Sequence, residues 1–268
     1  MLILNWNISY GCKIEKIFNE ITNLVKSQKT FIITLQEVTQ KSFEFLKNKL
    51  QEKSYIYYSL NYRQPGKYDT NSRKLGVAII ISKNFEVLDA NVFSRCLLPE
   101  RTLFTTIKHK NKTFKIATFH SITGCAHKKA KSIQFYSFAE TVENYQPDIL
   151  TIDANEPEID HFDISEMKFF NNLDKGKGAE TFFRSCINNN LTDCFAKNFN
   201  PKNFLEGNPL TTSHIINNNR KCSVKKNKRY DFVFLNLNKI NFKKIEYNLE
   251  NAFKATSDHA YITIKAKI

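Results

Sequence analysis

Short runs of β-branched and aromatic residues recur along the chain, and they constrain its fold more than any other feature. Such runs are typical of strands that are buried on at least one face. Within residues 75–119 they follow one another across short turns, which favours antiparallel pairing. The predicted strands cover residues 2–8, 31–36, 55–60, 75–82, 85–92, 102–108, 113–119, 148–152, 231–237 and 259–265. A fold rich in β-sheet follows from these runs.

Helical periodicity separates some of the predicted strands. In residues 13–27, Ile14, Ile17 and Ile21 recur at the spacing of one helix face. Similar patterns predict further helices over residues 40–51, 128–144 and 165–172. The chain has 7 Gly and 6 Pro, and no repeat or linker divides it. We therefore expect one mixed α/β domain over residues 1–268, with two sheets faced by helices.

The formal net charge of +14 favours polyanionic partners such as nucleic acid. Two polar stretches, 61–74 and 198–229, are predicted as long loops, and such loops often carry substrate contacts. We expect the basic segment 220–229 and the lysines of 128–131 to lie around a substrate cleft. Two alternatives stay open: these are solvated loop charges, and the lysine content reflects an AT-rich genome.

Cysteine usage and the length of the apolar runs bear on the compartment. Six cysteines occur at irregular spacing with no C-x-x-C pair, which is typical of free thiols in a reducing compartment. No apolar run approaches the length of a membrane span. Residues 1–8 have the pattern of a strand rather than of a signal peptide. We therefore expect a soluble cytoplasmic monomer with no membrane contact.

Polar side chains follow several of the apolar runs at the point where each run ends. Asn7 ends the first run, and Glu37 and His120 directly follow two others. Asp153 and Asn155 follow a fourth, at a spacing that places both on one side of a strand. Each has an ordinary alternative: an acid in a first helical turn, a structural histidine, or a turn built by Asx residues. The recurrence of the pattern favours a shared site.

The start of the last predicted strand adds a further signal. Asp258 and His259 stand there, and Asp231 begins the predicted strand before it. Burying a carboxylate and an imidazole is costly unless each finds a partner. A metal near Asp258 and a carboxylate partner for His259 would supply both. Carboxylate and amide oxygens suit Mg²⁺ or Mn²⁺, and a hard metal, an activated water and a proton shuttle are what phosphate-ester hydrolysis needs.

Taken in chain order, these motifs resemble the endonuclease/exonuclease/phosphatase superfamily, whose members include DNase I, abasic endonucleases, sphingomyelinases and deadenylases. The resemblance implies an α+β fold, a four-layer αββα sandwich of two mixed, mainly antiparallel sheets flanked by helices. The ordered set is more specific than any single motif. It consists of Leu4-Asn5-Trp6-Asn7-Ile8, Leu35-Gln36-Glu37, Leu75-Gly76-Val77-Ala78-Ile79, Glu100-Arg101, Thr118-Phe119-His120-Ser121, Asp153-Ala154-Asn155, Arg229-Tyr230-Asp231-Phe232 and Ser257-Asp258-His259.

The resemblance also implies a metal site and a carboxylate–histidine pair. Glu37 matches the principal Mg²⁺ ligand, and Asn7 and Asp258 match further metal or water-mediated ligands. His259 matches the histidine that contacts the scissile phosphate or acts as general base, and Asp231 matches the acid that orients it. Mg²⁺ is therefore the expected cofactor, with Mn²⁺ as a substitute.

Four more positions receive roles from the resemblance. Asp153 positions or deprotonates the attacking water, and Asn155 holds water or a phosphate oxygen. His120 matches a phosphate ligand or general acid of the DNase I, sphingomyelinase and deadenylase branches. Arg101 matches a phosphate-contacting arginine of the DNase I branch. Each of these residue types offsets charge or moves a proton during in-line attack on a phosphodiester.

The sequence departs from particular branches of the superfamily. Val38-Thr39 follows Glu37 where abasic endonucleases carry a lysine, which argues against abasic-site repair. Arg73 and Lys74 lie where DNase I supplies a glutamate partner for its first histidine, and Ile152 replaces a common glycine. The predicted function is Mg²⁺-dependent hydrolysis of phosphodiester bonds in DNA or RNA. The alternatives are a phosphatase or phosphodiesterase acting on lipid or small-molecule phosphate esters, and a silent binding module.

Overall fold

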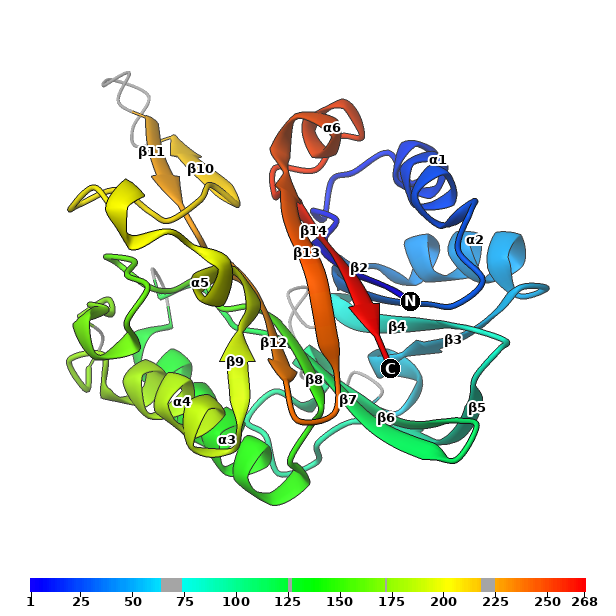
Figure 1. Cartoon of the computed structure of the whole chain (residues 1–268), viewed down its shortest axis with the longest axis horizontal. Helices are drawn as coiled ribbons and strands as arrows, with labels where there is room; N and C mark the ends of the chain where they lie inside the picture. The colour runs from blue at the N-terminus through cyan, green and yellow to red at the C-terminus, as the bar shows by residue number, and fades with distance from the viewer. Residues whose placement is uncertain (64–73, 125–126, 172, 218–224) are drawn as a thin grey trace.

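Two six-stranded sheets form the centre of the protein in the computed structural model, which describes residues 1–63, 74–124, 127–171, 173–217 and 225–268 (Figure 1). The first sheet contains, in spatial order, β13 (Asn241–Asn248), β14 (Tyr261–Lys267), β1 (Leu2–Asn7), β2 (Phe31–Val38), β4 (Gly76–Ser82) and β3 (Ser54–Tyr58). The second contains β5 (Glu86–Asn91), β6 (Thr102–His109), β7 (Lys112–His120), β8 (Ile149–Asp153), β12 (Asp231–Asn236) and β9 (Leu191–Asp193). A separate hairpin pairs β10 (His214–Asn217) with β11 (Lys225–Lys228).

Helices cover the outer faces of both sheets and complete four layers (Figure 1). Three separate apolar clusters fill the three spaces between those layers. The first sheet packs against α1 (Ile14–Val25), α2 (Gln40–Leu50) and α6 (Leu249–Lys254), and the second against α3 (Lys128–Tyr145) and α4 (Lys177–Asn188). The predicted αββα sandwich is confirmed. Among the described helices, none has the length and apolar character needed to cross a membrane.

Short elements complete the chain. α5 (Cys194–Asn198) follows β9, and short 3₁₀ turns occur at η1 (Ser59–Asn61), η3 (Pro99–Arg101), η4 (Ile164–Glu166) and η5 (Pro201–Asn203). Four of the cysteines, Cys12, Cys96, Cys186 and Cys194, are free thiols. The other two, at 125 and 222, lie outside the described residues.

Strand β1 shows how alternation builds the layers and then opens the site. Leu2, Leu4 and Trp6 belong to the cluster that packs against helices, whereas Ile3 belongs to the cluster between the sheets. Because strand side chains alternate, Asn5 and Asn7 point to the same side as Ile3. The space between the sheets is therefore apolar at the start of β1 and polar at its end.

A buried hydrogen-bond network joins the two sheets where this space becomes polar. Asn5 Oδ1 accepts hydrogen bonds from Thr34 Oγ1 at 2.9 Å and from Gln36 Nε2 at 2.8 Å. Gln36 Nε2 also donates to Thr118 Oγ1 of β7, in the other sheet, at 3.0 Å. Buried polar groups remain costly unless they are paired, so these bonds hold β2 and β7 at one separation next to the site.

Each sheet contains one parallel strand pair, and each such pair is joined by a helix. β1 and β2 are parallel and α1 connects them, while β7 and β8 are parallel and α3 connects them. In such βαβ units the carboxyl ends of the strands meet at one edge, where ligands bind in open α/β sheets. These ends carry Asn7 and Glu37 in the first sheet, and His120 and Asp153 in the second.

The antiparallel neighbours of these units begin at the same edge. β14 pairs with β1, and β12 pairs with β8 so that Asp231 lies opposite Asp153. His120 lies opposite Asp153 on its other side. His259 stands two residues before the start of β14. The topology alone therefore brings the polar strand ends of both sheets to one edge of the sandwich.

Two predictions about local structure were wrong. Residues 165–171 are not an α-helix, because η4 ends at Glu166 and the backbone of Lys168 then forms two hydrogen bonds with Ile159. The predicted loop 198–229 contains the β10–β11 hairpin. Helix α4 and strands β9 and β13 lie outside the predicted elements. Part of each predicted loop, residues 64–73 and 218–224, lies outside the described residues.

Candidate active site

Glu37 reaches the site from a distorted end of β2. The pairing of β2 with β4 shifts register between Leu35 and Val38, and Glu37 has a φ of 57°. That left-handed conformation costs a non-glycine residue about 1–2 kcal/mol, so the surrounding structure must enforce it. Glu37 Oε2 accepts a hydrogen bond from the backbone N–H of Tyr10 at 2.8 Å. The bulge thus turns a carboxylate out of the strand and holds it at the edge of the sandwich.

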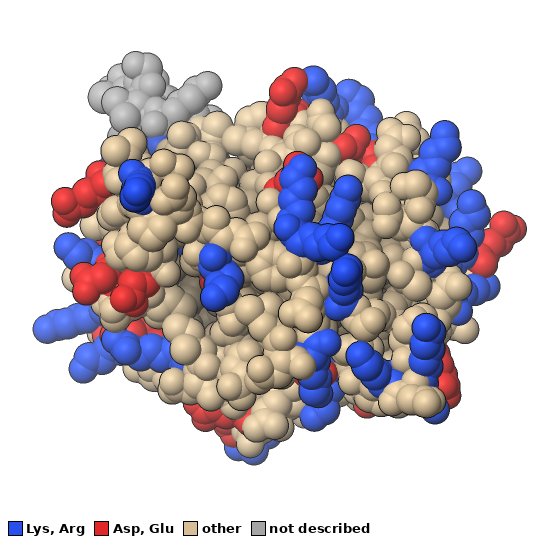
Figure 2. All heavy atoms as spheres, viewed as in Figure 1, with Lys and Arg blue, Asp and Glu red and all other residues tan. Residues whose placement is uncertain are grey.

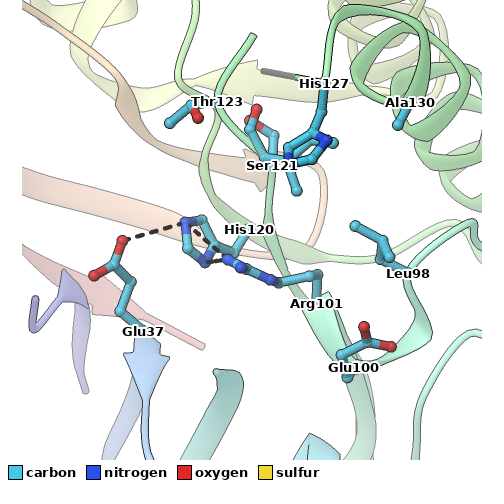
Figure 3. Close-up of a pocket in the computed structure, with 10 residues that line it drawn as sticks. Glu37, Leu98, Glu100, Arg101, His120, Ser121, Thr123, His127 and Ala130 are labelled. Carbon is cyan, nitrogen blue, oxygen red and sulfur yellow. Dashed lines mark hydrogen bonds and ion pairs between the residues drawn. The ribbon is translucent and has the colours of Figure 1, made fainter. Parts of the chain in front are cut away.

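His120 and Arg101 form a buried contact at the floor of a cavity of about 350 Å³ (Figure 3). Arg101 Nη1 lies 2.5 Å from His120 Nδ1 and 3.3 Å from Nε2; because a guanidinium only donates, the shorter contact favours Nδ1 as the acceptor and Nε2 as the protonated nitrogen. Burial, and next the positive charge of Arg101, lower the pKa of His120 well below its usual value. Nε2 lies 3.5 Å from Asp153 Oδ2 and 3.7 Å from Glu37 Oε1. The residue at His120 Nδ1 is therefore an arginine, not the glutamate of DNase I.

Asp153 is fully enclosed at the end of β8. Its carboxylate accepts hydrogen bonds from Asn7 Nδ2 at 2.8 Å and from the backbone N–H of Asn155 at 3.1 Å. Burial raises the pKa of Asp153 to about 7, the charge of His259 opposes that rise, and the charge of Asp231 adds to it. Near neutral pH this carboxyl group therefore exchanges a proton readily.

Asp231 and His259 form the predicted carboxylate–histidine pair. His259 Nδ1 lies 2.8 Å from Asp231 Oδ2, and both side chains are buried. Burial alone lowers the pKa of a histidine, but the carboxylates of Asp231 and Asp153 outweigh it and raise the pKa of His259 to about 10. The imidazole of His259 is thus protonated at neutral pH, with its Nε2–H directed away from Asp231.

The predicted residues form one cluster. Ligand atoms of Asp153, Asp231 and His259 all lie within 4.8 Å of one another, and the His120–Asp153 and His120–Glu37 contacts extend this group to the other side of the site. The structure therefore brings together both sheets' polar strand ends, as the recurring sequence pattern predicted.

The donor set at this edge fits a hard cation. Glu37 and Asn7 offer carboxylate and amide oxygens, the type that Mg²⁺ prefers. Asp231 Oδ1 is buried without a hydrogen-bond partner among the described residues, so a cation or a water there would satisfy it. Asp258 is exposed and lies close to His259 and His214. The compact groups of three or more acids, histidines or cysteines found among the described residues do not include Glu37.

Asn155 borders the cluster, and a buried lysine holds its backbone. Asn155 has a φ of 49°, and its side-chain Nδ2 donates to the carbonyl of Ser121 at 3.1 Å. Lys131 Nζ donates to the carbonyl of Asn155 at 2.7 Å and pairs with Glu156 at 2.8 Å. The ion pair is almost completely buried, so Lys131 supports the turn after β8. The prediction that Lys131 faces a substrate cleft was wrong.

Two more of the predicted cleft cations bind groups of the protein itself. Arg229 is buried and binds Asp160 and Asp193 at 2.7–2.8 Å. Lys228 Nζ donates to the carbonyl of Glu158. The charge in segment 220–229 is therefore partly structural: it anchors the strand that leads to Asp231. Residues 220–224 of that segment lie outside the described residues.

His214 is a site residue that the sequence analysis missed. Its ring stacks on that of His259, with centroids 4.3 Å apart and planes 25° apart, and its Nδ1 lies 3.2 Å from the carbonyl oxygen of Asp258. The neighbouring Ser213 Oγ accepts hydrogen bonds from the backbone N–H groups of Tyr230 and Asp231. The root of the β10–β11 hairpin thus supports both members of the Asp231–His259 pair.

Solved structures of similar fold cover the whole chain. TDP2 from D. rerio complexed with single-strand DNA product aligns with 100% of this chain and 99% of its own, at a TM-score of 0.66 and 12% identity. The human Nocturnin catalytic domain with bound sulfate anion aligns with 100% of this chain and 94% of its own, at 0.67 and 16% identity. An endonuclease/exonuclease/phosphatase from Bacteroides vulgatus aligns with 100% of this chain and 98% of its own, at a TM-score of 0.65 and 16% identity. No protein-family model and no curated protein matches the sequence.

Proposed function

We propose that this chain, whose fold is that of the endonuclease/exonuclease/phosphatase superfamily, hydrolyses phosphodiester bonds in nucleic acid with the help of Mg²⁺. The observation that carries the proposal is the convergence of a carboxylate, a buried carboxyl of raised pKa and a carboxylate–imidazolium pair at one edge of two sheets. The free thiols of Cys12, Cys96, Cys186 and Cys194 support a cytoplasmic location for this enzyme, because free thiols are typical of a reducing compartment.

Asp153 and His259 have different roles in the proposed reaction. Asp153 takes a proton from the attacking water, because its pKa of about 7 leaves a basic carboxylate available at neutral pH. His259 contacts a phosphate oxygen through Nε2–H, because Asp231 keeps the ring oriented and protonated. Of the two roles that the resemblance left open for His259, its raised pKa favours phosphate contact over general base.

The other half of the site stabilises charge. His120 offers Nε2–H while Arg101 occupies Nδ1, so the two side chains face the phosphate as a neutral donor and a cation. Glu37 and Asn7 would hold the Mg²⁺ ion, with Asp258 near them, and that ion would neutralise the developing charge on the phosphate. Asn155 orders the turn that carries Asp153.

Cleavage of nucleic acid with and without metal tests the proposal. Plasmid DNA and single-stranded DNA and RNA should be cleaved in Mg²⁺ or Mn²⁺ and left intact in EDTA. Glu37→Ala and His259→Ala, checked for folding by circular dichroism, should each lose at least about 10²-fold in kcat. Full activity in both folded variants would overturn the site assignment. Turnover of lipid or inositol phosphates by an enzyme inactive on every nucleic acid would overturn the substrate class.

A further inference from the structure

A second cavity, of about 500 Å³, lies next to Glu37 and shares no described lining residue with the cavity at His120. Tyr10 lines it, and the backbone N–H of Tyr10 is the group that binds Glu37 Oε2. Thr39, two residues after Glu37, lines it as well. The carboxylate expected to hold the metal therefore stands between the two cavities.

The described lining of this second cavity is cationic. Lys41 and Lys74 contribute to it, both are exposed, and none of its described lining residues is a carboxylate. The cavity at His120 differs because Glu37 and Glu100 line it. Lys41 also stands in the first turn of α2, which contains no acidic residue. A cation is unfavourable at the positive end of a helix, so an anion in this cavity would be stabilised by both sources of charge.

An exposed aromatic ring adjoins the two lysines. Tyr10 is 67% exposed, whereas other aromatic residues near α2, such as Phe43 and Tyr58, are buried and stack on each other. A flat ring next to cations is the combination that binds single-stranded nucleic acid, because cations contact the phosphate and the ring stacks on a base. The chemistry of the cavity thus matches one nucleotide rather than an isolated anion.

We propose that this cavity binds the nucleotide adjacent to the scissile phosphate, with Lys41 and Lys74 on its phosphate and Tyr10 against its base. The inference rests on the proposed function, since it places the next nucleotide of the bound nucleic-acid strand on the far side of Glu37. It also names a substrate class: a single-stranded or locally unpaired DNA or RNA segment, because a base must leave its stack to lie on Tyr10.

The lysines are tested by binding, which does not depend on turnover. Fluorescence anisotropy in EDTA measures the Kd of a labelled single-stranded hexanucleotide for the wild type and for Lys41→Ala/Lys74→Ala. We expect the double variant to bind about tenfold more weakly, and the slope of log K against log salt to flatten by about 0.7 for one lost phosphate contact. The matched control is Lys243→Ala/Lys267→Ala.

The control lysines stand on the β13–β14 edge, where Figure 2 shows Lys and Arg side chains gathered over the middle of this face. Both double variants remove two positive charges. A difference between them therefore reports position rather than net charge. Equal weakening by both, or no weakening by either, would overturn the subsite.

Activity on two substrates separates this inference from the proposed function. Bis(p-nitrophenyl) phosphate is a diester with no neighbouring nucleotide, so Lys41→Ala/Lys74→Ala should lose at least about tenfold more kcat/KM on the hexanucleotide than on this diester. Equal losses on both substrates would contradict the subsite. A wild-type enzyme that hydrolyses neither would contradict the proposed function, and the anisotropy comparison would still decide the subsite.

The tyrosine is tested with a fluorescent base. A single-stranded oligonucleotide carrying 2-aminopurine should be quenched when it stacks on Tyr10 of the wild type. Tyr10→Ala should abolish the quenching and weaken binding about 5- to 150-fold, the range expected for one stacked base. Tyr10→Phe retains the ring and should restore both signals. Failure of Phe to restore them, or full quenching in Tyr10→Ala, would show that the base does not lie on this ring.

Discussion

His259 and His120 lie on opposite sides of one site, both fully buried, yet their neighbours carry opposite charges. His259 contacts the carboxylate of Asp231, and its pKa is raised to about 10. His120 contacts the guanidinium of Arg101, and its pKa is lowered well below the usual value. Burial disfavours the charged form of both rings, so the charge of the contacting side chain decides which ring is positively charged.

This difference in charge gives the two histidines different roles at the site. In the proposed mechanism, an imidazolium and a neutral imidazole offer the same Nε2–H donor, but only the imidazolium adds a full positive charge next to the phosphate. Asp153 lies against both rings, and its raised pKa reflects a balance between His259 and the acids around it. A change of partner on either ring should therefore be felt at Asp153 as well.

The largest test of the comparison exchanges the partner of His259. Asp231→Asn removes the charge that keeps the ring protonated, so the pKa of His259 should fall, and kcat should fall about 10³- to 10⁴-fold. NMR titration of the ring and single-turnover cleavage measure the two effects. Glu52→Gln, an equal charge change at an exposed position, is the control. A His259 ring that stays protonated at pH 8 in the variant would show that Asp231 does not set its charge.

Asp153→Asn tests the acid that lies between the rings. Loss of the base should reduce kcat about 10²-fold or more. Because burial raises the pKa of Asp153, this group stabilises the fold fully below pH 3.8 and loses that contribution as the pH rises through about 7. The variant lacks this loss, so its stability relative to the wild type should grow between pH 4 and pH 8.

The size of that growth should be on the order of 4 kcal/mol, since the pKa of Asp153 is raised from 3.8 to about 7 and one pKa unit corresponds to about 1.4 kcal/mol. Urea unfolding of both proteins across this pH range measures it. A constant difference between the two proteins would mean that Asp153 ionises as freely in the folded chain as in the unfolded one.

Much of the site was predictable because it follows from strand periodicity. Asn7 and Asp153 stand where buried strands end, and alternation places both on the side that faces the other sheet. Glu37 also stands at a strand end, but it reaches the site through the bulge after Leu35, which alternation does not predict. The cost of burying Asp258 and His259 predicted a carboxylate partner for His259, and the family resemblance implied that this partner is Asp231; the contact is present at 2.8 Å. These features depend on local pattern, on general energetic rules and on the order of the motifs along the chain.

The remaining features depend on long-range packing. The lysine-rich stretch 128–131 predicts that Lys131 is exposed, but its buried ion pair with Glu156 joins residues from different parts of the chain. His214 lies in an Asn-rich stretch that local composition assigns to a loop, and its stacking partner His259 comes much later in the chain. Residues 165–171 contain helix formers, yet backbone pairing with Ile159 overrides that local preference. No local signal encodes such contacts.

A smaller effect is expected on the neutral side of the comparison. Arg101→Gln removes the charge beside His120, so the pKa of His120 should rise towards its ordinary value, and kcat/KM should fall about 10²-fold as phosphate stabilisation is lost. Arg101→Lys restores the charge without the planar fork and should recover part of the rate. NMR titration of the His120 ring measures the shift. An unchanged ring pKa in Arg101→Gln would show that burial and the charge of His259, not Arg101, lower the pKa of His120.

The smallest expected effect concerns the ring stacked on His259. Burial, and next the charge of His259, lower the pKa of His214. The face of a neutral imidazole ring therefore stacks on the imidazolium of His259. His214→Ala removes this ring and should lower kcat about 2- to 10-fold with little change in KM, because an aromatic contact contributes about 0.5–1.5 kcal/mol. His214→Phe retains an aromatic ring and should recover most of the rate. If Phe behaves like Ala, the contribution comes from the polar contact of His214 Nδ1 with Asp258, and the stack is incidental.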